Sequence, residues 1–277
     1  MNLAVGFFDG VHVGHQRILA HADAALTFTN HPATVFAPDR APRLLMTTEE
    51  RLAAISVQGV RRVIARDFTS ELAAQSPGEF AASLRRDFPD LEEVFCGPNW
   101  TFGADGAGTA DLLRALGFQV TVVPFATWRG EPVSSTRIRA ALGEGDVAAA
   151  AAMLGRPYSA SGRIVAGKGE GRALGFPTLN IVPFLGDLSL ERGVYAVETA
   201  FGRGVANWGV APTMGERAWP EPVLEVHLLT APTESPPATL RVAFTSFIRP
   251  ERTFASRADL QEQIALDKQS VTKGENR

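Results

Sequence analysis

The chain has 277 residues and a mass of 29.6 kDa, which is more than one domain usually holds, so two domains are expected. A hydrophobic share of 45% and a charged share of 21% exclude a mainly disordered chain, and a net charge of −3 argues against a nucleic-acid-binding protein. The single cysteine, Cys96, excludes a disulfide framework and any metal cluster built on cysteines. The sequence has neither a long apolar run nor the features of a signal peptide, so we expect a cytoplasmic protein without a membrane partner.

The first half of the chain alternates between short apolar segments and helical patterns. Strands are expected over residues 2–8, 25–29, 60–65, 93–96 and 119–123, and helices over 14–22, 48–58, 77–88 and 109–116. Within residues 48–58, Leu52, Ala54 and Ile55 are spaced as one apolar helix face. The alternation predicts an α/β domain with a parallel sheet, helices on both faces and ligands at the carboxyl ends of the strands.

The second half has a different pattern. A helical stretch over 133–154, interrupted at 143–145, precedes short segments separated by Gly and Pro. Strands are expected over 161–165, 194–199, 205–208, 223–229 and 239–244, and a helix over 258–266. This predicts an antiparallel β-barrel with a terminal helix. We therefore expect one domain over 1–155 and a second over 156–277.

Histidines and glycines gather in the segment GFFDGVHVGH, residues 6–15, where a strand is expected to end and a helix to begin. Free backbone N–H groups at such a turn, together with the imidazoles of His12 and His15, suit a phosphate group. An isolated H-x-x-H segment is more often only a tight turn with one surface and one half-buried histidine. A zinc site is not expected, because no third ligand stands at a useful spacing.

Three further segments carry groups that could bind a ligand. They are TFTNHP at 27–32 with another histidine, the Gly-flanked aromatic loop CGPNWTFG at 96–103, and SSTRIR at 134–139 with three hydroxyls and two guanidiniums. In this order, the four segments resemble the adenylyltransferase half of the bacterial bifunctional riboflavin kinase/FAD synthetases, a Rossmann-like nucleotidyltransferase domain with an H-x-G-H signature. One departure is Asn30, which stands where the family usually has proline.

The resemblance implies that the phosphate of FMN attacks the α-phosphorus of ATP and that pyrophosphate leaves. His12 and His15 would act in catalysis, and the loops with His31, Asn99 and Phe102 would meet FMN. The ATP contacts that it implies are Gly6, Phe8, Asp9, Gly10, His12, His15, Ser134, Ser135, Thr136 and Arg139.

Two pairs of polar residues stand out in the second half. Thr178 and Asn180 are two apart, so in an extended segment their oxygens face one side, and such hard ligands suit Mg²⁺. Glu225 and His227 are spaced in the same way within an apolar strand, although a strand glutamate is more often simply solvated. The preceding segment GRIVAGK, 162–168, is rejected as a P-loop because Gly169 replaces the Ser or Thr and no helix can follow.

The segments GEGRALGFPTLN at 169–180, GVYA at 193–196, GVAPT at 209–213, EVHL at 225–228 and FIRPE at 247–251 resemble riboflavin kinase, in order. The resemblance implies that Glu225 is the base that accepts the ribityl hydroxyl proton, that Mg²⁺ lies at Thr178 and Asn180, and that Tyr195 and Arg249 contact the flavin. The ATP contacts that it implies are Gly167, Gly169, Gly171, Arg172, Gly175 and Pro177.

Both resemblances together predict a bifunctional enzyme that converts riboflavin and ATP to FMN, and then FMN and ATP to FAD. Two alternatives stay open. One is a riboflavin kinase whose N-terminal domain has degenerated, and the other is a flavin- or nucleotide-binding regulator without catalysis. The oligomeric state is left open as well.

Overall fold

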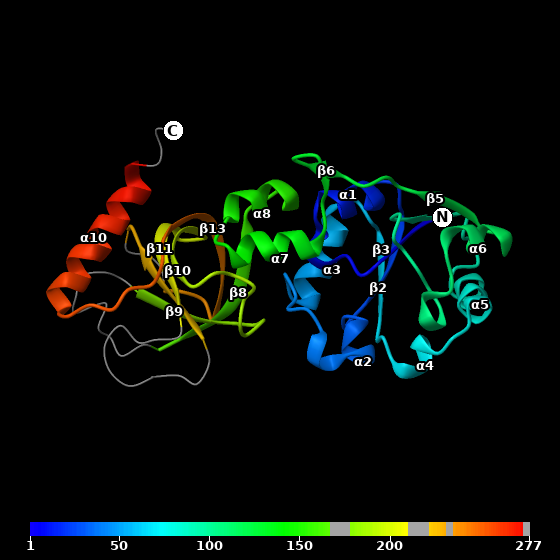
Figure 1. Cartoon of the computed structure of the whole chain (residues 1–277), viewed down its shortest axis with the longest axis horizontal. Coiled ribbons are helices and arrows are strands. Elements are labelled where there is room, and N and C mark those ends of the chain that lie inside the picture. The colour runs from blue at the N-terminus through cyan, green and yellow to red at the C-terminus, as the bar shows by residue number, and fades with distance from the viewer. Residues whose placement is uncertain (167–177, 210–221, 231–234, 274–277) are drawn as a thin grey trace. The chain divides into compact units, whose positions relative to one another are not determined.

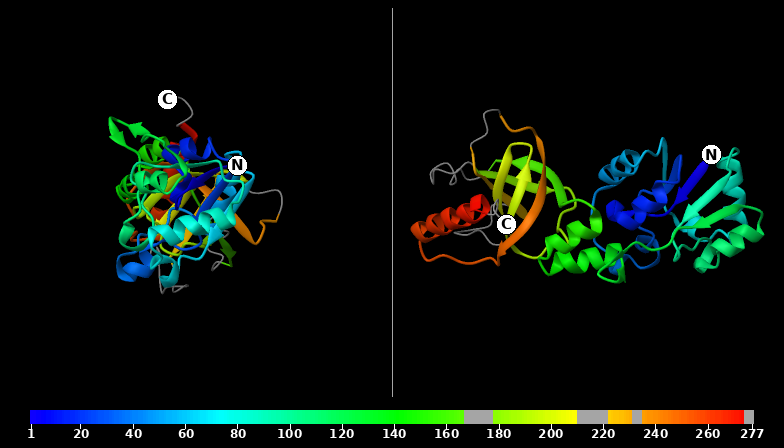
Figure 2. Two further views of the ribbon diagram at one scale, coloured as in Figure 1. Left: turned by 90° about the vertical axis from the view of Figure 1, so that its right-hand side faces the viewer. Right: turned by 90° about the horizontal axis from the view of Figure 1, so that it is seen from above.

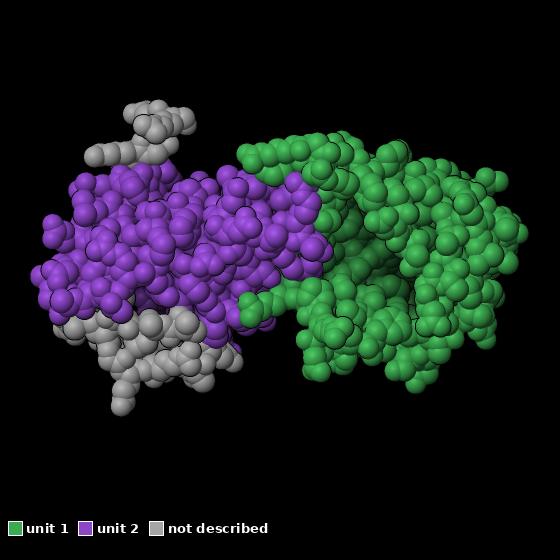
Figure 3. Space-filling view, in the orientation of Figure 1, with its two compact units in different colours: residues 1–135 green, residues 136–277 purple. Residues whose placement is uncertain are grey.

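The computed structural model describes residues 1–166, 178–209, 222–230 and 235–273. The chain divides into two compact units, Met1–Ser135 and Thr136–Arg277 (Figure 3). Among the described residues, no helix combines the length and the apolar character that crossing a bilayer requires.

The first unit is built on a five-stranded sheet in the order β3-β2-β1-β4-β5, and every neighbouring pair is parallel (Figure 1). Its strands are β1 (Asn2–Val5), β2 (Ala24–Phe28), β3 (Arg62–Arg66), β4 (Glu93–Cys96) and β5 (Gln119–Val122). The predicted parallel sheet is confirmed. The first strand ends earlier than expected, at Val5, because the chain turns at Phe8, whose φ of 59° is left-handed.

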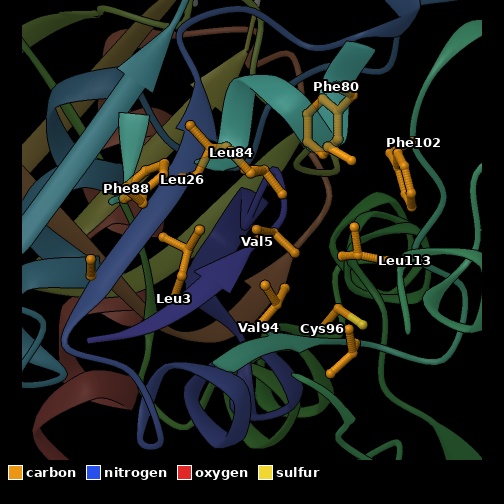
Figure 4. Close-up of a cluster of buried hydrophobic side chains, with 13 residues drawn as sticks. Leu3, Val5, Leu26, Phe80, Leu84, Phe88, Val94, Cys96, Phe102 and Leu113 are labelled. Carbon is orange, nitrogen blue, oxygen red and sulfur yellow. The ribbon is translucent and has the colours of Figure 1, made fainter. Parts of the chain in front are cut away.

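Alternate side chains of these strands pack on opposite faces of the sheet. Leu3 and Val5 of β1 face α5 (Pro77–Asp87) and α6 (Ala110–Ala115), in a cluster with Leu84 and Leu113 (Figure 4). Ala4 of β1 faces the other way, toward α1 (Val13–Leu19) and α3 (Thr48–Val57). The helices therefore cover both faces, as the alternation predicts.

Several short elements have no counterpart in the predictions. They are α2 (Ala33–Phe36), α4 (Ser70–Ala73) and the hairpin of β6 (Thr127–Trp128) with β7 (Glu131–Pro132). Segments of two to four residues are too short to show a hydrophobic period.

The second unit is a closed antiparallel barrel in the order β10-β11-β12-β9-β8-β13. Its strands are β8 (Tyr158–Val165), β9 (Thr178–Pro183), β10 (Gly193–Thr199), β11 (Gly202–Gly209), β12 (Val223–Leu228) and β13 (Thr239–Arg249). The predicted barrel is confirmed, with β9 as an additional strand. The strands pack closely: a Cβ on Gly162 would lie 2.3 Å from the carbonyl oxygen of Val182.

Helix α10 (Arg257–Lys273) runs along the outside of the barrel and is longer than the predicted 258–266 (Figures 1 and 2). Its Val271 packs with Val194, Ala196 and Val205, which therefore point outward from the barrel. Arg203 of β11 donates to the carbonyl oxygen of Val271 at 2.5 Å. Val205 of β11 therefore belongs to the outer face of the barrel. His227 of β12, its partner in the strand register, belongs to the same face.

Helices α7 (Ser135–Gly143) and α8 (Val147–Leu154) join the sheet to the barrel in sequence. Helix α8 packs against β8 and β13, which explains why the compact unit begins before the barrel does. The domain boundary at residue 155 stays a prediction.

Candidate active sites

The turn after β1 brings the first group of predicted residues to the carboxyl edge of the sheet. Phe8, Gly10 and Val11 all have positive φ, of 59°, 79° and 39°, and this tight path returns the chain at once into α1. Strand β1 lies between β2 and β4, so this turn stands where the strand order changes direction. Open α/β sheets bind their ligands at such a point.

His12 and His15 form a stacked pair in this turn. The His12 Nδ1 accepts the backbone N–H of His15 at 3.3 Å, and the ring centroids are 3.5 Å apart. Because Nδ1 is an acceptor, neutral His12 carries its proton on Nε2 and can donate from there. A Cβ on Gly14 would lie 3.1 Å from the His12 ring, so glycine leaves room for the pair.

His12 is buried and His15 is half-buried, and both burial and the neighbouring imidazole act on the pKa of His15. Burial lowers the pKa of His15 well below its ordinary value, and a charge on His12 lowers it further. Phe8 meets the His15 ring edge-on at 5.3 Å between centroids. His15 is therefore a neutral imidazole at pH 7.

Asp9 and Ser135 connect this turn to its surroundings. The Asp9 carboxylate is 3% exposed and accepts the Leu45 backbone N–H through both oxygens, at 3.0 and 3.2 Å. The Ser135 hydroxyl donates to the Asp9 carbonyl oxygen at 2.9 Å. The sequence segments around residues 9 and 134–135 thus meet in space. Thr136 and Arg139 belong to the second unit, and their roles at the phosphates stay predictions.

His31 follows the end of β2, beside β1, and lies near this turn. Its Nδ1 accepts the backbone N–H of Ala33 at 3.1 Å, and its ring meets Phe7 at 4.7 Å between centroids. Asn30, the departure from the family pattern, binds both backbone groups of Phe68, donating at 3.0 Å and accepting at 2.8 Å. Asn30 therefore ties the end of β2 to the end of β3.

The two residues predicted as FMN contacts in the loop after β4, Asn99 and Phe102, lie in different surroundings. Asn99 is exposed, whereas Phe102 is 6% exposed and packs in the core with Phe80 and Trp100. The structure therefore brings Asn99, and not the Phe102 ring, to the surface of the loop.

The barrel collects its polar residues in two rows on its outer face. In one row, Glu225 on β12 pairs with Asn180 on β9 and with Asn207 on β11. In the other, His227 pairs with Thr178 and with Val205, which faces α10. The intervening Leu224 and Val226 are fully buried, so the predicted alternation is confirmed.

The row beside α10 contains a buried, neutral histidine, His227. Thr178 Oγ1 and His227 Nδ1 form a hydrogen bond of 3.1 Å. Burial, and to a lesser extent the charge of Lys268, lowers the pKa of His227 to about 4, although Asp267 opposes the shift. Lys268 also donates to the Leu228 carbonyl oxygen at 2.9 Å, so α10 is fastened to β12 next to the second row.

Asn207 is a neighbour of the predicted site residue Glu225 that sequence reasoning missed. Cβ atoms of directly opposed residues in an antiparallel pair lie about 5 Å apart, so Asn207 stands next to Glu225. The Asn207 amide donates to Glu251 Oε1 at 3.2 Å, and a Cβ on Gly209 would collide with that carboxylate. Only the register of β11 against β12 reveals this neighbour, and the sequence does not fix that register.

Two residues expected near the flavin have structural partners. Tyr195 is fully buried, donates to the Glu191 carbonyl oxygen at 2.7 Å, and has its pKa raised by burial. The Arg249 guanidinium donates to both carboxylate oxygens of Asp267, at 2.8 to 3.2 Å. The contacts of Tyr195 and Arg249 with the flavin stay predictions. The predicted ATP contacts Gly167, Gly169, Gly171, Arg172, Gly175 and Pro177 lie outside the described residues.

These features define a class of protein with two units. One is an open α/β sheet of the kind that binds nucleotides, and the other is a closed β-barrel with polar residues on its outer face. The model of the FAD synthetase family matches residues 1–137, and the model of the riboflavin kinase family matches residues 154–274. The chain belongs to the bifunctional riboflavin kinase/FMN adenylyltransferase family. The presence of both family domains supports the bifunctional reading over the two alternatives.

Curated relatives match this chain along nearly its whole length. The bifunctional riboflavin kinase/FMN adenylyltransferase of Bacillus subtilis is 32% identical, over 97% of this chain and 90% of its own. That of Escherichia coli K12 is 34% identical, over 96% and 90%. That of Pseudomonas fluorescens is 33% identical, over 95% and 89%.

A solved structure shares the whole fold. It matches with a TM-score of 0.86 and 27% identity, covering 98% of this chain and 93% of its own, and it is described as a macrolide-efflux protein from Streptococcus pneumoniae. That description applies to the Streptococcus chain. The family models and the curated relatives assign this chain to the flavin enzymes.

Proposed function

We propose that each unit carries one of the two reactions of this enzyme. The chain phosphorylates riboflavin to FMN with ATP and adenylylates FMN to FAD with release of pyrophosphate. The observation that carries the division is that Glu225 lies on the barrel, whereas the His12–His15 pair lies at the edge of the sheet.

In the kinase reaction, Glu225 accepts the proton of the flavin 5′-hydroxyl as its oxygen attacks the γ-phosphorus of ATP. The new bond joins that oxygen to phosphorus, the bond to the bridging β,γ-oxygen breaks, and ADP leaves. The half-buried position of Glu225, opposite Asn180 and Asn207 in the strand register, supports this role because it places the carboxylate among polar side chains.

Thr178 and Asn180 are the residues that would hold Mg²⁺ beside Glu225. Both offer neutral oxygens on the outer face, and the described residues contain no group of three acidic, histidine or cysteine side chains suited to a metal. Such a donor set fits an ion that arrives with the nucleotide and keeps several waters. When bound, Mg²⁺ neutralises charge on the phosphates.

In the adenylyl transfer, the FMN phosphate oxygen attacks the α-phosphorus of ATP and pyrophosphate leaves. His12 donates from Nε2 to a phosphate oxygen, since its Nδ1 is occupied by the His15 backbone N–H. Neutral His15 fixes the plane of the His12 ring by stacking and adds no charge of its own. Aligning the two anionic reactants is the main task of this site.

Two variants of the intact chain test the division. Glu225→Gln should lower FMN formation from riboflavin by roughly 10²–10⁴ and leave FAD formation from FMN unchanged. His15→Ala removes the ring that fixes the plane of His12, so it should lower FAD formation by roughly 10²-fold and spare FMN formation. Products are separated by chromatography after incubation with ATP and Mg²⁺.

Each variant has a matched control. Glu198→Gln changes an exposed glutamate on β10, and His21→Ala changes an exposed histidine that stacks on Phe95. Both should retain both activities. Equal loss of the two activities in folded Glu225→Gln, or an unchanged FAD rate in His15→Ala, would contradict the proposal.

A further inference from the structure

Arg51 on α3 is a fully buried cation in the first unit. Its exposure is 0%, and it is the one lysine or arginine among the described residues that is buried. Its Nη2 donates to the carbonyl oxygens of Phe28 and, at 3.3 Å, Thr29. Its Nε and Nη1 have no hydrogen-bond partner in the described part of the chain. Burying a charge with unsatisfied donors is costly, so the position of Arg51 calls for an explanation.

Arg51 contacts both the turn after β1 and the end of β2, the two segments that carry His12 and His31. The guanidinium carbon lies 4.0 Å from the centroid of the Phe7 ring, in the turn after β1. Phe7 in turn meets the His31 ring edge-on, in the loop after β2. The carbonyls that Arg51 binds belong to the last residue of β2 and the residue after it. One side chain thus touches the β1 turn and the end of β2.

Arg51 also affects the charge of the turn. Its positive charge interacts with that of Asp9, whose carboxylate is almost fully buried. Burial lowers the pKa of Arg51, while Asp9 and then Glu49 raise it, and an arginine keeps its proton throughout. Arg51 therefore offsets a buried negative charge immediately beside the position proposed for the phosphates.

We propose that Arg51 is a positioning residue for adenylyl transfer. It holds the β1 turn, which carries His12, and the β2 loop, which carries His31, at a fixed separation. It does so through its cation–π contact with Phe7 and its hydrogen bonds to the end of β2. It also prevents the Asp9 carboxylate from repelling ATP. This inference rests on the proposed placement of the adenylyl-transfer site at the β1 turn.

Two substitutions separate the geometric effect from the charge effect. Arg51→Lys keeps the charge but loses the guanidinium that lies over the Phe7 ring and bonds two carbonyl oxygens, so kcat for FAD formation should fall roughly 10- to 100-fold. Its KM for ATP should stay within twofold of the parent. Arg51→Met removes the charge as well, so its KM for ATP should also rise at least about fivefold. FMN formation from riboflavin by the same chain should be unchanged in both.

A control uses an exposed arginine on α5 that makes the same two kinds of contact, with an aromatic ring and with a carbonyl oxygen. Arg85 stacks on Phe118 at 4.3 Å and donates to the Leu116 carbonyl oxygen at 2.5 Å, in the segment that precedes β5. Arg85→Lys should leave all constants of FAD formation within twofold. The proposal would be overturned if kcat fell equally in Arg51→Lys and Arg51→Met, the KM for ATP stayed unchanged in both variants, and both had a lower melting temperature. Arg51 would then be a purely structural residue.

A third variant keeps the test decisive if the Arg51 variants fail to fold. Phe7→Leu leaves the buried guanidinium in place and removes the ring between it and His31. It should lower kcat for FAD formation roughly tenfold at unchanged KM for ATP. An unchanged kcat in folded Phe7→Leu would overturn the proposal. If His15→Ala keeps its FAD rate while Arg51→Lys loses it, the roles of the histidines fail and the role of Arg51 stands.

Discussion

Removing the carboxylate of Asp267 should release α10 from the barrel. Asp267 is 4% exposed, and it accepts three bonds from Arg249, whose side chain is 16% exposed, and one from Gln263 at 2.9 Å. Breaking a buried ion pair from one side costs about 3–5 kcal/mol. Because Arg249 keeps some contact with water, we expect the lower end of this range, about 3 kcal/mol, for Asp267→Ala.

Hydrogen exchange measures this loss within the intact chain. A cost of about 3 kcal/mol raises the population of the undocked helix, and the exchange rate of the α10 amides, about a hundredfold. Amides of the sheet should not change. Glu262→Gln, an exposed carboxylate on the same helix, should stay within about 0.5 kcal/mol of the parent. If the α10 amides of Asp267→Ala exchanged within threefold of the parent rate, the ion pair would not be what holds the helix.

Three further outcomes are expected. Because the folded pKa of His227 lies near 4, below the unfolded 6.5, the unfolded chain binds more protons between these values, and stability falls as pH drops from about 6.5 to 4. His227→Gln should flatten this part of the curve of denaturation midpoint against pH, and an unchanged slope would contradict the buried neutral ring. Asn180→Ala should raise the Mg²⁺ concentration for half-maximal FMN formation and leave the FAD step alone; tight Mg²⁺ binding by the protein without nucleotide, measured by calorimetry, would instead implicate Glu225 as a ligand. Gly162→Ala should destabilise the barrel by about 1–3 kcal/mol in urea titration, since its Cβ would collide with the Val182 carbonyl, and a neutral result would show that the two strands can separate.

The sequence predicts the parts of the fold that local patterns determine. The strands of the sheet and their order of alternation with helices follow from hydrophobic period, and the placement of Glu225 with His227 on one face follows from the pleat. Strand β9 was expected only as an extended segment, because Pro177 and the glycines before it obscure the pattern of a strand.

What could not be predicted depends on contacts between distant segments. Arg51 lies four residues before Ile55 and shares its buried face, but a charged residue at such a position is normally read as solvated. Its burial depends on the carbonyls at the end of β2, which no local pattern shows. The sequence also did not show that Arg249 pairs with Asp267 or that Phe102 packs in the core; the ligand contacts that the resemblance implies for both stay predictions.

The order of strands in the barrel has a consequence for protein synthesis. The five strands of the sheet are complete once Val122 has been made, whereas β8, the first strand of the barrel, pairs with β13, which ends only at Arg249. Domains generally fold as units, the N-terminal one first, during synthesis. On the ribosome, the FAD-forming unit therefore has all its strands long before the barrel can close. A chain that stops after residue 230 should lose phosphorylation of riboflavin while the sheet of its first unit remains whole.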